Sequence, residues 1–413
     1  MAAPAVARPE EARRLVDDLI DDLLARHDPA TTPREVLWGA QFDAGLAWVH
    51  FPEGRGGLGL DPELQDRIDQ RLAAAGVENN LARNMMGVGM AGPTLIEYGT
   101  LEQQDALLRR IWTCEDIWCQ MFSEPGAGSD VAALATRAVR DGDEWVVNGQ
   151  KVWTTLAHVA DKGLLLARTD PDVPKHLGLT YFWVDMHAPG VEVRALRQMT
   201  GEAEFNEIYL TDVRIPDRQR IGPVGEGWRV AMTTLGNERN MLGKLAVPTR
   251  SGGPIRHVLR LWRERVARGS GPDPVLRDRV VRVWMEAEVL RLTMLRAEAN
   301  RERGTPGPEA SIGKIGVSPH HQRLYGLCME LLGPEGMLVS GYEMTRPDTV
   351  SPSILGDEEQ AADVQKAFLT AVGATIGGGT TEIARNVVGE RVLGLPREPS
   401  VDRDVPWSEI PRS

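Results

Sequence analysis

The hydrophobic period changes twice along the chain, and this restricts the fold more than any other feature. Up to about residue 116, apolar side chains recur at about one helical turn, as at Leu15, Leu19 and Leu23. Short β-prone runs separated by Gly, Pro and Asp begin near Trp118. Beyond residue 232 the helical period returns, with one apolar face formed by Leu276, Val280, Trp284, Ala287 and Leu290. This order predicts an α+β protein with a helical domain at 1–116, a β domain at 117–232 and a second helical domain at 233–413.

Glycine-rich and polar segments predict where the chain turns. In the β domain, Asn148-Gly149 lies between two apolar runs. Because this pair accepts the positive φ angles of a type I′ turn, we expect a hairpin there. FPEGRGGLGL, at 51–60, predicts a connector between N-terminal helices. After Leu395 the chain is rich in Pro and Asp, which predicts a tail of low order.

Composition and charge argue against several classes of protein. The 413 residues are 42% hydrophobic, which is enough to bury a large core. A net charge of −12 would repel a phosphate backbone, so we expect no nucleic-acid partner. The acidic N-terminus and the lack of a run of roughly 18 apolar residues predict a cytoplasmic protein without a membrane span. Cys114, Cys119 and Cys328 are too few and too unevenly spaced for a zinc site or a disulfide framework.

Two glycine-rich loops are candidates for ligand binding. In MFSEPGAGSD, at 121–130, tight turns leave main-chain N–H groups and the hydroxyls of Ser123 and Ser129 to donate hydrogen bonds to a flat polar ligand or an anion. In GGGTTEI, at 377–383, glycines precede a predicted helix whose first N–H groups would favour an anion. On the pattern alone, an ordinary loop and a solvated helix start remain the alternatives.

Several segments taken together are far more specific than either loop. Five segments occur in the order and approximate spacing of the acyl-CoA dehydrogenases. They are MFSEPGAGSD, NGQKVWTT, FNEIYLTDVRIP followed by GEGW, the Glu238-Arg239 pair and GGGTTEIARNVVGERVLGLP. The chain resembles that family from about Phe51 to Pro396. The resemblance implies a helical N-terminal domain, a middle β-barrel or sandwich domain and a C-terminal four-helix bundle. It also implies FAD, held where the domains meet and completed across a dimer interface.

The resemblance assigns roles to individual residues. Those that would bind FAD in this chain are Phe122, Ser123, Gly128, Trp153, Thr155, Gly379, Thr380 and Glu382. Trp153 and Thr155 would flank the flavin ring, and Thr380 would hydrogen-bond the pyrophosphate. Ser129 and Arg239 would face the acyl-CoA. Judged without the family context, Trp153 would instead be a core aromatic residue at the end of a strand.

The catalytic base is not at the position that many family members use. Those members carry a glutamate immediately before the Gly-Thr of the C-terminal loop, where this chain has Gly378. The Gly378 N–H can still polarise the thioester carbonyl, but glycine cannot take a proton. Other members place the glutamate on the first helix after the β domain, and Glu238 of the Glu238-Arg239 pair stands there. A solvated or structural ion pair at Glu238 and Arg239 is the alternative.

The chain departs from the family in the second half of the FAD site. The family usually supplies an Arg-x-x-Phe-Gly segment and a Gln from the neighbouring subunit, and the nearest matches here are Arg268, in RGSGP, and Glu330, in MELLGPEG. A carboxylate beside a pyrophosphate is repulsive unless it is protonated or paired. Either FAD is held differently, or another subunit contributes. QMTGEAEFNEI, at 198–208, also resembles bacterial members of a steroid side-chain group that are heterotetramers of two related chains. We therefore expect a homotetramer or a heterotetramer.

The resemblance implies FAD-dependent α,β-dehydrogenation of an acyl-CoA, or of an acyl group on a carrier, to a trans-2-enoyl thioester. Glu238 would remove the α-proton, flavin N5 would accept the hydride, and an electron-transferring flavoprotein would reoxidise the cofactor. The alternatives are a flavin oxidase or monooxygenase on the same scaffold, and a subunit of a heteromeric enzyme with reduced or no activity alone. For the adjacent His320 and His321 we predict a surface or helix-start role and no metal, because no third ligand lies nearby in the sequence.

Overall fold

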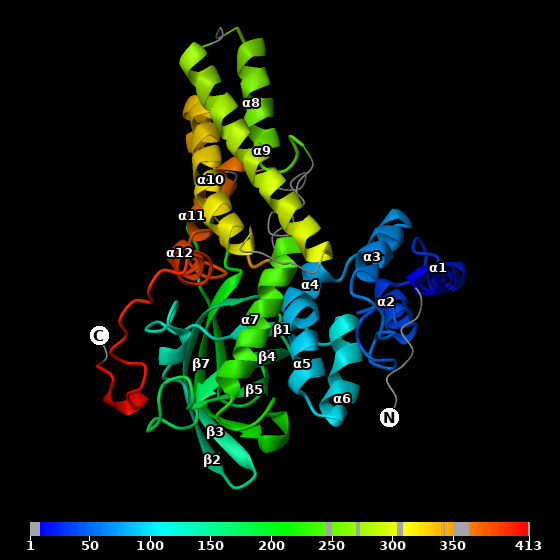
Figure 1. Ribbon diagram of the computed structural model, residues 1–413, viewed down its shortest axis with the longest axis vertical. Coiled ribbons are helices and arrows are strands. Elements are labelled where there is room, and N and C mark those ends of the chain that lie inside the picture. The colour runs from blue at the N-terminus through cyan, green and yellow to red at the C-terminus, as the bar shows by residue number, and fades with distance from the viewer. Residues whose placement is uncertain are drawn as a thin grey trace.

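The protein has three parts, seen in a computed structural model that describes residues 9–244, 250–269, 273–303, 309–339, 341, 343–350 and 363–411. Figure 1 shows N-terminal helices on one side, a twisted sheet at the bottom and long helices at the top. This order confirms the α+β class with a helical, a β and a second helical region. The N-terminal helices are α1 (Pro9–Arg26), α2 (Arg34–Asp43), α3 (Leu64–Ala74), α4 (Leu81–Met86), α5 (Gly92–Tyr98) and α6 (Leu101–Trp112), with a π-helical turn, η1 (Gly87–Ala91), between α4 and α5.

Helix α1 confirms the helical period expected from Leu15, Leu19 and Leu23. Its buried residues are Ala12, Val16, Ile20 and Leu23, whereas Leu15 is 45% exposed. Leu19 packs against the same buried cluster as Leu23. A stripe through Val16 and Ile20 lies one residue further along and buries two β-branched side chains against α3.

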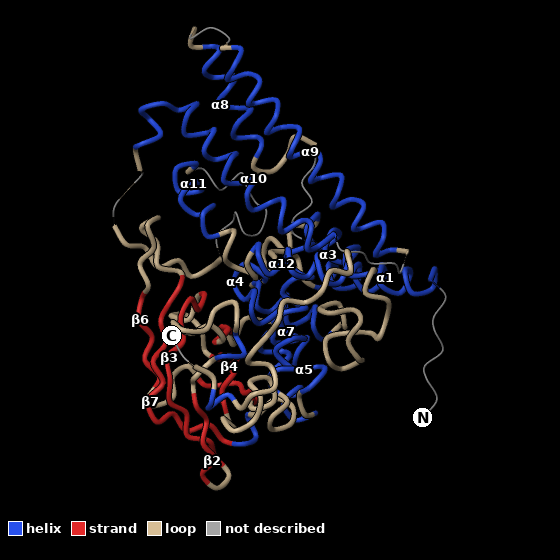
Figure 2. Tube along the Cα trace, turned by 60° about the vertical axis from the view of Figure 1, so that its left-hand side comes forward, coloured by secondary structure: helices blue, strands red, loops and turns tan. Residues whose placement is uncertain are grey.

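The middle region is a seven-stranded mixed sheet, which Figure 2 shows at the opposite end of the molecule from the long helices. Its strands are β1 (Trp118–Met121), β2 (Arg137–Asp141), β3 (Glu144–Thr155), β4 (Lys162–Arg168), β5 (Leu179–Asp185), β6 (Val191–Ala195) and β7 (Phe205–Pro216). The strand order is β1-β4-β2-β3-β7-β6, and β5 pairs with β4. Strand β4 runs parallel to β1 and β2, and the other pairs are antiparallel.

The predicted hairpin at Asn148-Gly149 is wrong, because both residues lie inside the long strand β3. The register of β3 against β7 shifts between Val147 and Gly149, so Gly149 marks a β-bulge. A Cβ on Gly149 would lie 2.4 Å from the Thr136 hydroxyl oxygen, which explains a small residue at this position. The hairpin turn falls instead between β2 and β3, where Gly142 has φ of 66°.

The C-terminal helices are α7 (Gly227–Lys244), α8 (Ile255–Ala267), α9 (Pro274–Glu302), α10 (Glu309–Leu332), α11 (Val364–Gly373) and α12 (Thr381–Val387). Helices α8 to α11 form a bundle with a shared buried cluster, to which Val258, Val280, Leu324 and Ala371 belong. On α9, Leu276 and Val280 are buried and Trp284 and Ala287 pack against the same cluster. Helix α7 contacts both the sheet and the N-terminal helices, and it spans the division that we expected at 232/233.

The end of the C-terminal tail, from Asp402 to Ser408, is held against the middle domain, so the expectation of low order after Leu395 is wrong for this part. Trp407, in the short helix η6 (Trp407–Glu409), is 8% exposed, and its indole N–H donates to the carbonyl of Ala133 at 3.1 Å. A buried tryptophan with a satisfied N–H outweighs the flexibility that Pro and Asp suggest. Across the described residues, no helix combines the length and the apolar character needed to cross a bilayer.

Candidate active site

The middle-domain loop that begins at Phe122 is fixed to strand β3. Phe122 is buried and its ring meets the ring of Tyr181 edge-on, with centroids 5.7 Å apart. The carbonyl of Ser123 accepts a hydrogen bond from the Val152 N–H at 2.9 Å. This bond places the predicted flavin contacts Phe122 and Ser123 beside the strand that carries Trp153 and Thr155.

A buried ion pair between Lys151 and Glu124 holds the loop that begins at Phe122 from the interior of the protein. Lys151 is fully buried, and its ammonium group donates to the Glu124 carboxylate at 2.8 Å and to the carbonyls of Phe122 and Leu166. The Glu124 carboxylate also accepts from the N–H groups of Ala135 and Thr136. Burial acts to raise the pKa of Glu124, but Lys151 and these hydrogen bonds outweigh it, and the pKa lies below its usual value. Glu124 is therefore a structural carboxylate that holds both ends of the loop.

Trp153 is an exposed aromatic residue in an unusual backbone conformation. The register of β3 against β7 shifts between Lys151 and Thr154, and Trp153 in this irregularity has φ of 60°. Its side chain is 58% exposed and meets Phe205 edge-on, with ring centroids 5.9 Å apart. Positive φ is strained for a bulky residue and marks functional positions more often than ordinary ones. Because its side chain is exposed in this chain, Trp153 is not a core aromatic residue. Thr155 lies two residues further along β3 and pairs with Phe205 on β7.

The glycine-rich turn at 125–130 faces open space. Gly126, Gly128 and Ser129 are exposed, and a Cβ added to either glycine would meet no atom within 4 Å. Asp130 is engaged by the Lys175 ammonium group at 2.7 Å. The turn thus presents the predicted substrate residue Ser129 on a surface that the protein leaves uncovered.

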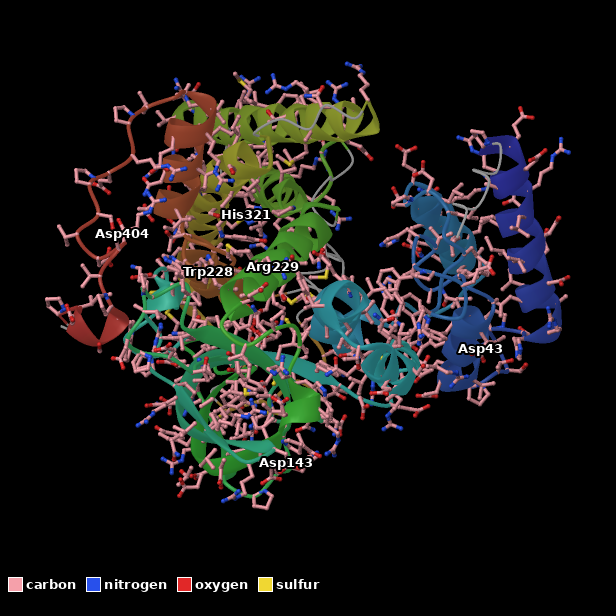
Figure 3. The ribbon with its side chains drawn as sticks, turned by 60° about the horizontal axis from the view of Figure 1, so that its bottom comes forward. Asp43, Asp143, Trp228, Arg229, His321 and Asp404 are labelled. Atoms are coloured by element: carbon pink, nitrogen blue, oxygen red, sulfur yellow. The ribbon has the colours of Figure 1, made fainter. Side chains whose placement is uncertain are left out.

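Helix α7 carries Glu238 and is anchored to both neighbouring regions. The Thr234 hydroxyl lies 2.8 Å from that of Thr94 on α5 and 3.0 Å from that of Tyr181 on β5. At the start of the helix, where Figure 3 labels Trp228 and Arg229, the Trp228 ring meets that of His176 at 4.8 Å. Glu238 lies near the other end and is partly buried. The side chain of Arg239 lies outside the described residues.

The C-terminal glycine loop is held by helix α10. The Lys314 ammonium group donates to the carbonyls of Ala374 at 2.7 Å and Gly377 at 2.5 Å, and the Ser318 hydroxyl donates to Ala374 at 2.8 Å. Burial lowers the pKa of Lys314, and the Glu238 carboxylate opposes this effect. The ammonium group that holds the loop containing Gly378 is therefore also within the electrostatic reach of Glu238 on α7.

The glycines of this loop adopt a left-handed backbone. Gly378 and Gly379 have φ of 64° and 86° and are exposed. The hydroxyl oxygen of Thr380 caps α12 by accepting from the Ile383 N–H at 3.1 Å. Glu382 is exposed, accepts from the Thr381 hydroxyl and pairs with Arg385 at 3.3 Å. An exposed glycine turn before a helix start leaves main-chain N–H groups available to a phosphate.

Arg268 and Glu330 are on the bundle. Glu330 forms a two-point ion pair with Arg279, one contact of which is 2.6 Å, so the carboxylate is paired as a nearby pyrophosphate would require. Arg268 follows α8 and lies 3.6 Å from Glu335. The C-terminal end of α8 is at the end of the bundle far from the sheet (Figure 1). Within one chain, Arg268 is therefore remote from Trp153.

The two histidines on α10 differ from expectation. His320 and His321 lie inside the helix just after Pro319, not at its start. His320 is 4% exposed and pairs with Glu286 at 3.1 Å, and burial lowers the pKa of His321, labelled in Figure 3, to about 4. The prediction of a surface or helix-start role is wrong, because the bundle covers this part of the helix. Within the described parts of the chain, no group of three or more His, Cys, Asp or Glu side chains is arranged to hold a metal ion.

Sequence reasoning missed Lys151 and Lys314. A lysine at an inward position of an alternating strand indicates a buried partner, and Lys151 lies in the apolar run that ends at Thr155. Lys314 and Ser318 are four residues apart, so they share one face of an otherwise apolar stretch of α10. Both signals are visible in the sequence, but neither shows which carbonyl or carboxylate is the partner.

Comparison with known proteins covers almost the whole chain. Residues 7–115, 119–213 and 225–393 match the N-terminal, middle and C-terminal domains of acyl-CoA dehydrogenases, respectively. The chain is 39% identical over 357 residues to the acyl-CoA dehydrogenase IpdE1 of Mycobacterium tuberculosis, covering 86% of each chain. Among solved structures, a chain of the Tcur3481-Tcur3483 steroid ACAD aligns with a TM-score of 0.68 and 26% identity, over 95% of this chain and all of that one. A chain of the ChsE4-ChsE5 complex of Mycobacterium tuberculosis aligns with a TM-score of 0.66 and 29% identity, over 96% of this chain and all of that one. The chain therefore belongs to the acyl-CoA dehydrogenase family of oxidoreductases.

Proposed function

We propose that the protein removes hydrogens from Cα and Cβ of an acyl thioester with FAD as its cofactor, giving a trans-2-enoyl thioester. The observation that carries this proposal is that Lys314, which donates to the carbonyls of Ala374 and Gly377 beside the glycine loop, also lies within the electrostatic reach of Glu238. A base for the α-proton and donors for the developing enolate-like oxygen are then close together, as the reaction requires. When bound, FAD would supply the acceptor of the β-hydride at N5.

The residues on the middle-domain side fit a flat aromatic ring. Trp153 has an exposed indole on a strained backbone, and Thr155 follows it on the same strand, β3. Phe122 and Ser123 lie beside this strand, to which the Ser123 carbonyl is hydrogen-bonded. Gly128 leaves room above the loop, since no protein atom occupies the space that its side chain would take. Together these positions would hold the isoalloxazine ring in place.

The residues on the C-terminal side fit a pyrophosphate. Gly379 and Thr380 would hold it through main-chain N–H groups and the threonine hydroxyl, while Glu382 would keep the following turn in place through Thr381 and Arg385. Gly378 is exposed with a positive φ, and its N–H would donate to the thioester carbonyl. Glu238 would take the α-proton, and Ser129 and Arg239 would bind the acyl-CoA or carrier-bound substrate.

The site is proposed to be completed by another chain. Arg268, remote from Trp153 within one chain, would reach the FAD of a neighbour, and Arg279 would offset the charge of Glu330 there. An exposed apolar stripe on α9 supports association, and its residues are Val281, Met285, Val289 and Leu292. One solved neighbour, the ChsE4-ChsE5 complex, is an assembly of two different chains. Native mass together with the ratio of flavin to protein separates a homotetramer from a heterotetramer.

The decisive experiment is anaerobic reduction of the purified flavoprotein by a panel of straight, branched and steroid-like acyl-CoAs. A substrate should bleach the flavin rapidly, and an electron-transferring flavoprotein should restore the colour. One solved neighbour is named a steroid ACAD, which gives the steroid-like member of the panel particular weight. Rapid consumption of oxygen during turnover would favour an oxidase or monooxygenase. If the flavin is bleached only after a related chain is added, the protein is favoured as a subunit that is inactive on its own.

Replacing the proposed base gives the matching test of mechanism. Glu238→Gln should bind FAD normally and reduce dehydrogenation by about 10²- to 10⁴-fold, since a positioned base contributes that much. Glu226→Gln is the matched control, because Glu226 directly precedes the same helix and forms an exposed ion pair with Arg229. Near-normal turnover of Glu238→Gln would remove Glu238 from the mechanism.

A further inference from the structure

The C-terminal tail, 394–411, returns from the helical domain to the middle domain, as the red segment of Figure 1 shows. Its anchor is Trp407, whose ring lies 4.4 Å from the guanidinium carbon of Arg168. The main-chain N–H of Trp407 donates to the carbonyl of Val173 at 2.9 Å, and the indole N–H of Trp407 donates to the carbonyl of Ala133 at 3.1 Å. Trp407 thus contacts the 169–178 loop through its main chain and the segment that follows Ser129 through its indole.

Backbone contacts extend this anchor along the 169–178 loop. The Ser408 N–H donates to the carbonyl of Pro171 at 2.8 Å, and its hydroxyl lies 3.0 Å from the Asp172 carboxylate. Pro406 pairs with Pro174 in an isolated antiparallel bridge. The tail therefore runs beside the loop as one isolated bridge followed by the turn of η6.

A second anchor is ionic. The Lys175 ammonium group, on a residue only 8% exposed, donates to Asp130 at 2.7 Å and to Asp402 of the tail at 2.6 Å. The hydrogen bond from Lys175 lowers the pKa of Asp402 to about 2, so this carboxylate is charged at neutral pH. Asp130 directly follows Ser129, which places the ionic anchor next to the glycine-rich turn.

Arg168 joins the two anchors. It is 2% exposed and donates to the carbonyls of Ala132 at 2.5 Å, Leu134 at 3.2 Å and Lys175 at 3.1 Å. The Trp407 ring covers the guanidinium group that makes these bonds, and a cation over an indole face is attractive. Removing the indole would open Arg168 to water and loosen the carbonyls at 132–134.

We propose that the tail is a strap that positions the Ser129 turn for the acyl thioester, with Trp407 and Asp402 as its positioning residues. This inference rests on the proposed function, in which Ser129 binds the substrate. Glu238 is on α7, which Thr94 and Tyr181 hold through Thr234. Phe122 and Ser123 are held separately, through Lys151 and Val152. Loosening the strap should therefore weaken substrate binding and leave the chemical step and these two FAD contacts largely intact.

The test compares single variants of the full chain loaded with FAD. Trp407→Ala and Asp402→Asn should each raise KM about tenfold with kcat changed less than about twofold, the pattern of lost binding that is uniform through the reaction. Hydrogen exchange at 126–135 should become faster in both variants, since these amides lose local protection. Trp407→Phe, which keeps a ring beneath Arg168, should recover most of the effect. Asp404→Asn is the control, because Asp404 is an exposed residue of the same tail (Figure 3).

Each outcome decides the matter. Unchanged KM and exchange in Trp407→Ala and Asp402→Asn, as in the control, would overturn the strap. Faster exchange across β5 and β7 as well would also overturn it, because Trp407 would then be part of the general core. If none of the acyl-CoAs in the panel reduces the flavin of the unaltered protein, the proposed function fails. The exchange measurement still tests the strap in that event.

Discussion

The glycine-rich loops of the middle domain and of the C-terminal domain are surrounded differently by the protein. The middle-domain loop is held from inside by Glu124 and Lys151, both buried, and from outside by the tail through Lys175. The C-terminal loop is held on its carbonyl side by Lys314 and Ser318, whereas Gly377, Gly378 and Gly379 are exposed.

This difference separates two ways of preparing a site. A buried polar network that is fully satisfied fixes its members before any ligand arrives. An exposed loop with left-handed glycines gains stability only when something binds its N–H groups, whether ligand or partner chain. We therefore expect changes around the first loop to appear as lost protein stability, and changes around the second to appear as lost cofactor affinity.

The largest expected effect is on Lys151. Lys151→Met leaves the Glu124 carboxylate buried without its cation, and breaking such a pair costs about 3 to 5 kcal/mol of unfolding free energy. Lys162→Met is the matched control, because Lys162 on β4 pairs at 3.2 Å with Asp185, whose side chain is 46% exposed. A partly solvated pair should contribute less than about 1 kcal/mol. Urea unfolding of the two variants checks this, and equal losses would contradict a special role for the buried pair.

Glu204 shows what a buried carboxylate does where no lysine compensates its burial. It is 5% exposed, and burial, aided by Glu202, raises its pKa from 4.5 to about 7. Well below pH 4.5, the Glu204 carboxyl is protonated in both the folded and the unfolded protein. As the pH rises, it ionises first in the unfolded chain. Glu204 therefore lowers the free energy of unfolding progressively up to about pH 7. Glu204→Gln should therefore stabilise the protein by up to about 3 kcal/mol at pH 8 and by little at pH 5. Thermal unfolding across that range, with the exposed Glu343→Gln as control, measures the effect, and a gain independent of pH would contradict it.

A smaller effect is expected at the second loop. Lys314→Met removes the donor that holds the carbonyls of Ala374 and Gly377, and a charged hydrogen bond contributes about 1.5 to 3 kcal/mol. Because the loop is exposed, most of that loss should appear as FAD affinity weakened about tenfold, with a minor change in unfolding of the apoprotein. Quenching of flavin fluorescence gives the affinity. Lys366→Met, which breaks an ion pair with Glu202 in the segment before β7, should leave the affinity for FAD unchanged.

The order of the domains and most strands could be predicted from the sequence, because hydrophobic period is a local property. Long-range choices could not. The Asn148-Gly149 pair has the preferences of a turn, but pairing of β3 with β7 along its whole length overrides them. Likewise, the composition of the tail says nothing of the pocket that receives Trp407, since that pocket is assembled from residues 132–134, 168 and 173.

The candidate site divides in the same way. The loops around Ser123 and Thr380 were recognisable because a motif fixes their local backbone. The supports of those loops were not, since Lys151 and Lys314 act on carbonyls distant in sequence. The pairing of Glu330 with Arg279, 51 residues away, also depends on how α9 and α10 pack.

Thr380 gives the smallest and most selective test of the contrast between the loops. It caps α12 much as Thr100 caps α6, each accepting from the N–H three residues on, at 3.1 and 3.2 Å. Loss of an N-cap costs about 1 kcal/mol, so Thr100→Ala should lower unfolding stability by that amount and leave FAD affinity unchanged. Thr380→Ala should instead weaken FAD binding about fivefold, because the exposed cap helps shape the glycine turn, while Thr380→Ser should keep both properties. If Thr380→Ala and Thr100→Ala both lowered stability alone, α12 would be held like the N-terminal helices, and the second loop would not depend on a ligand for its order.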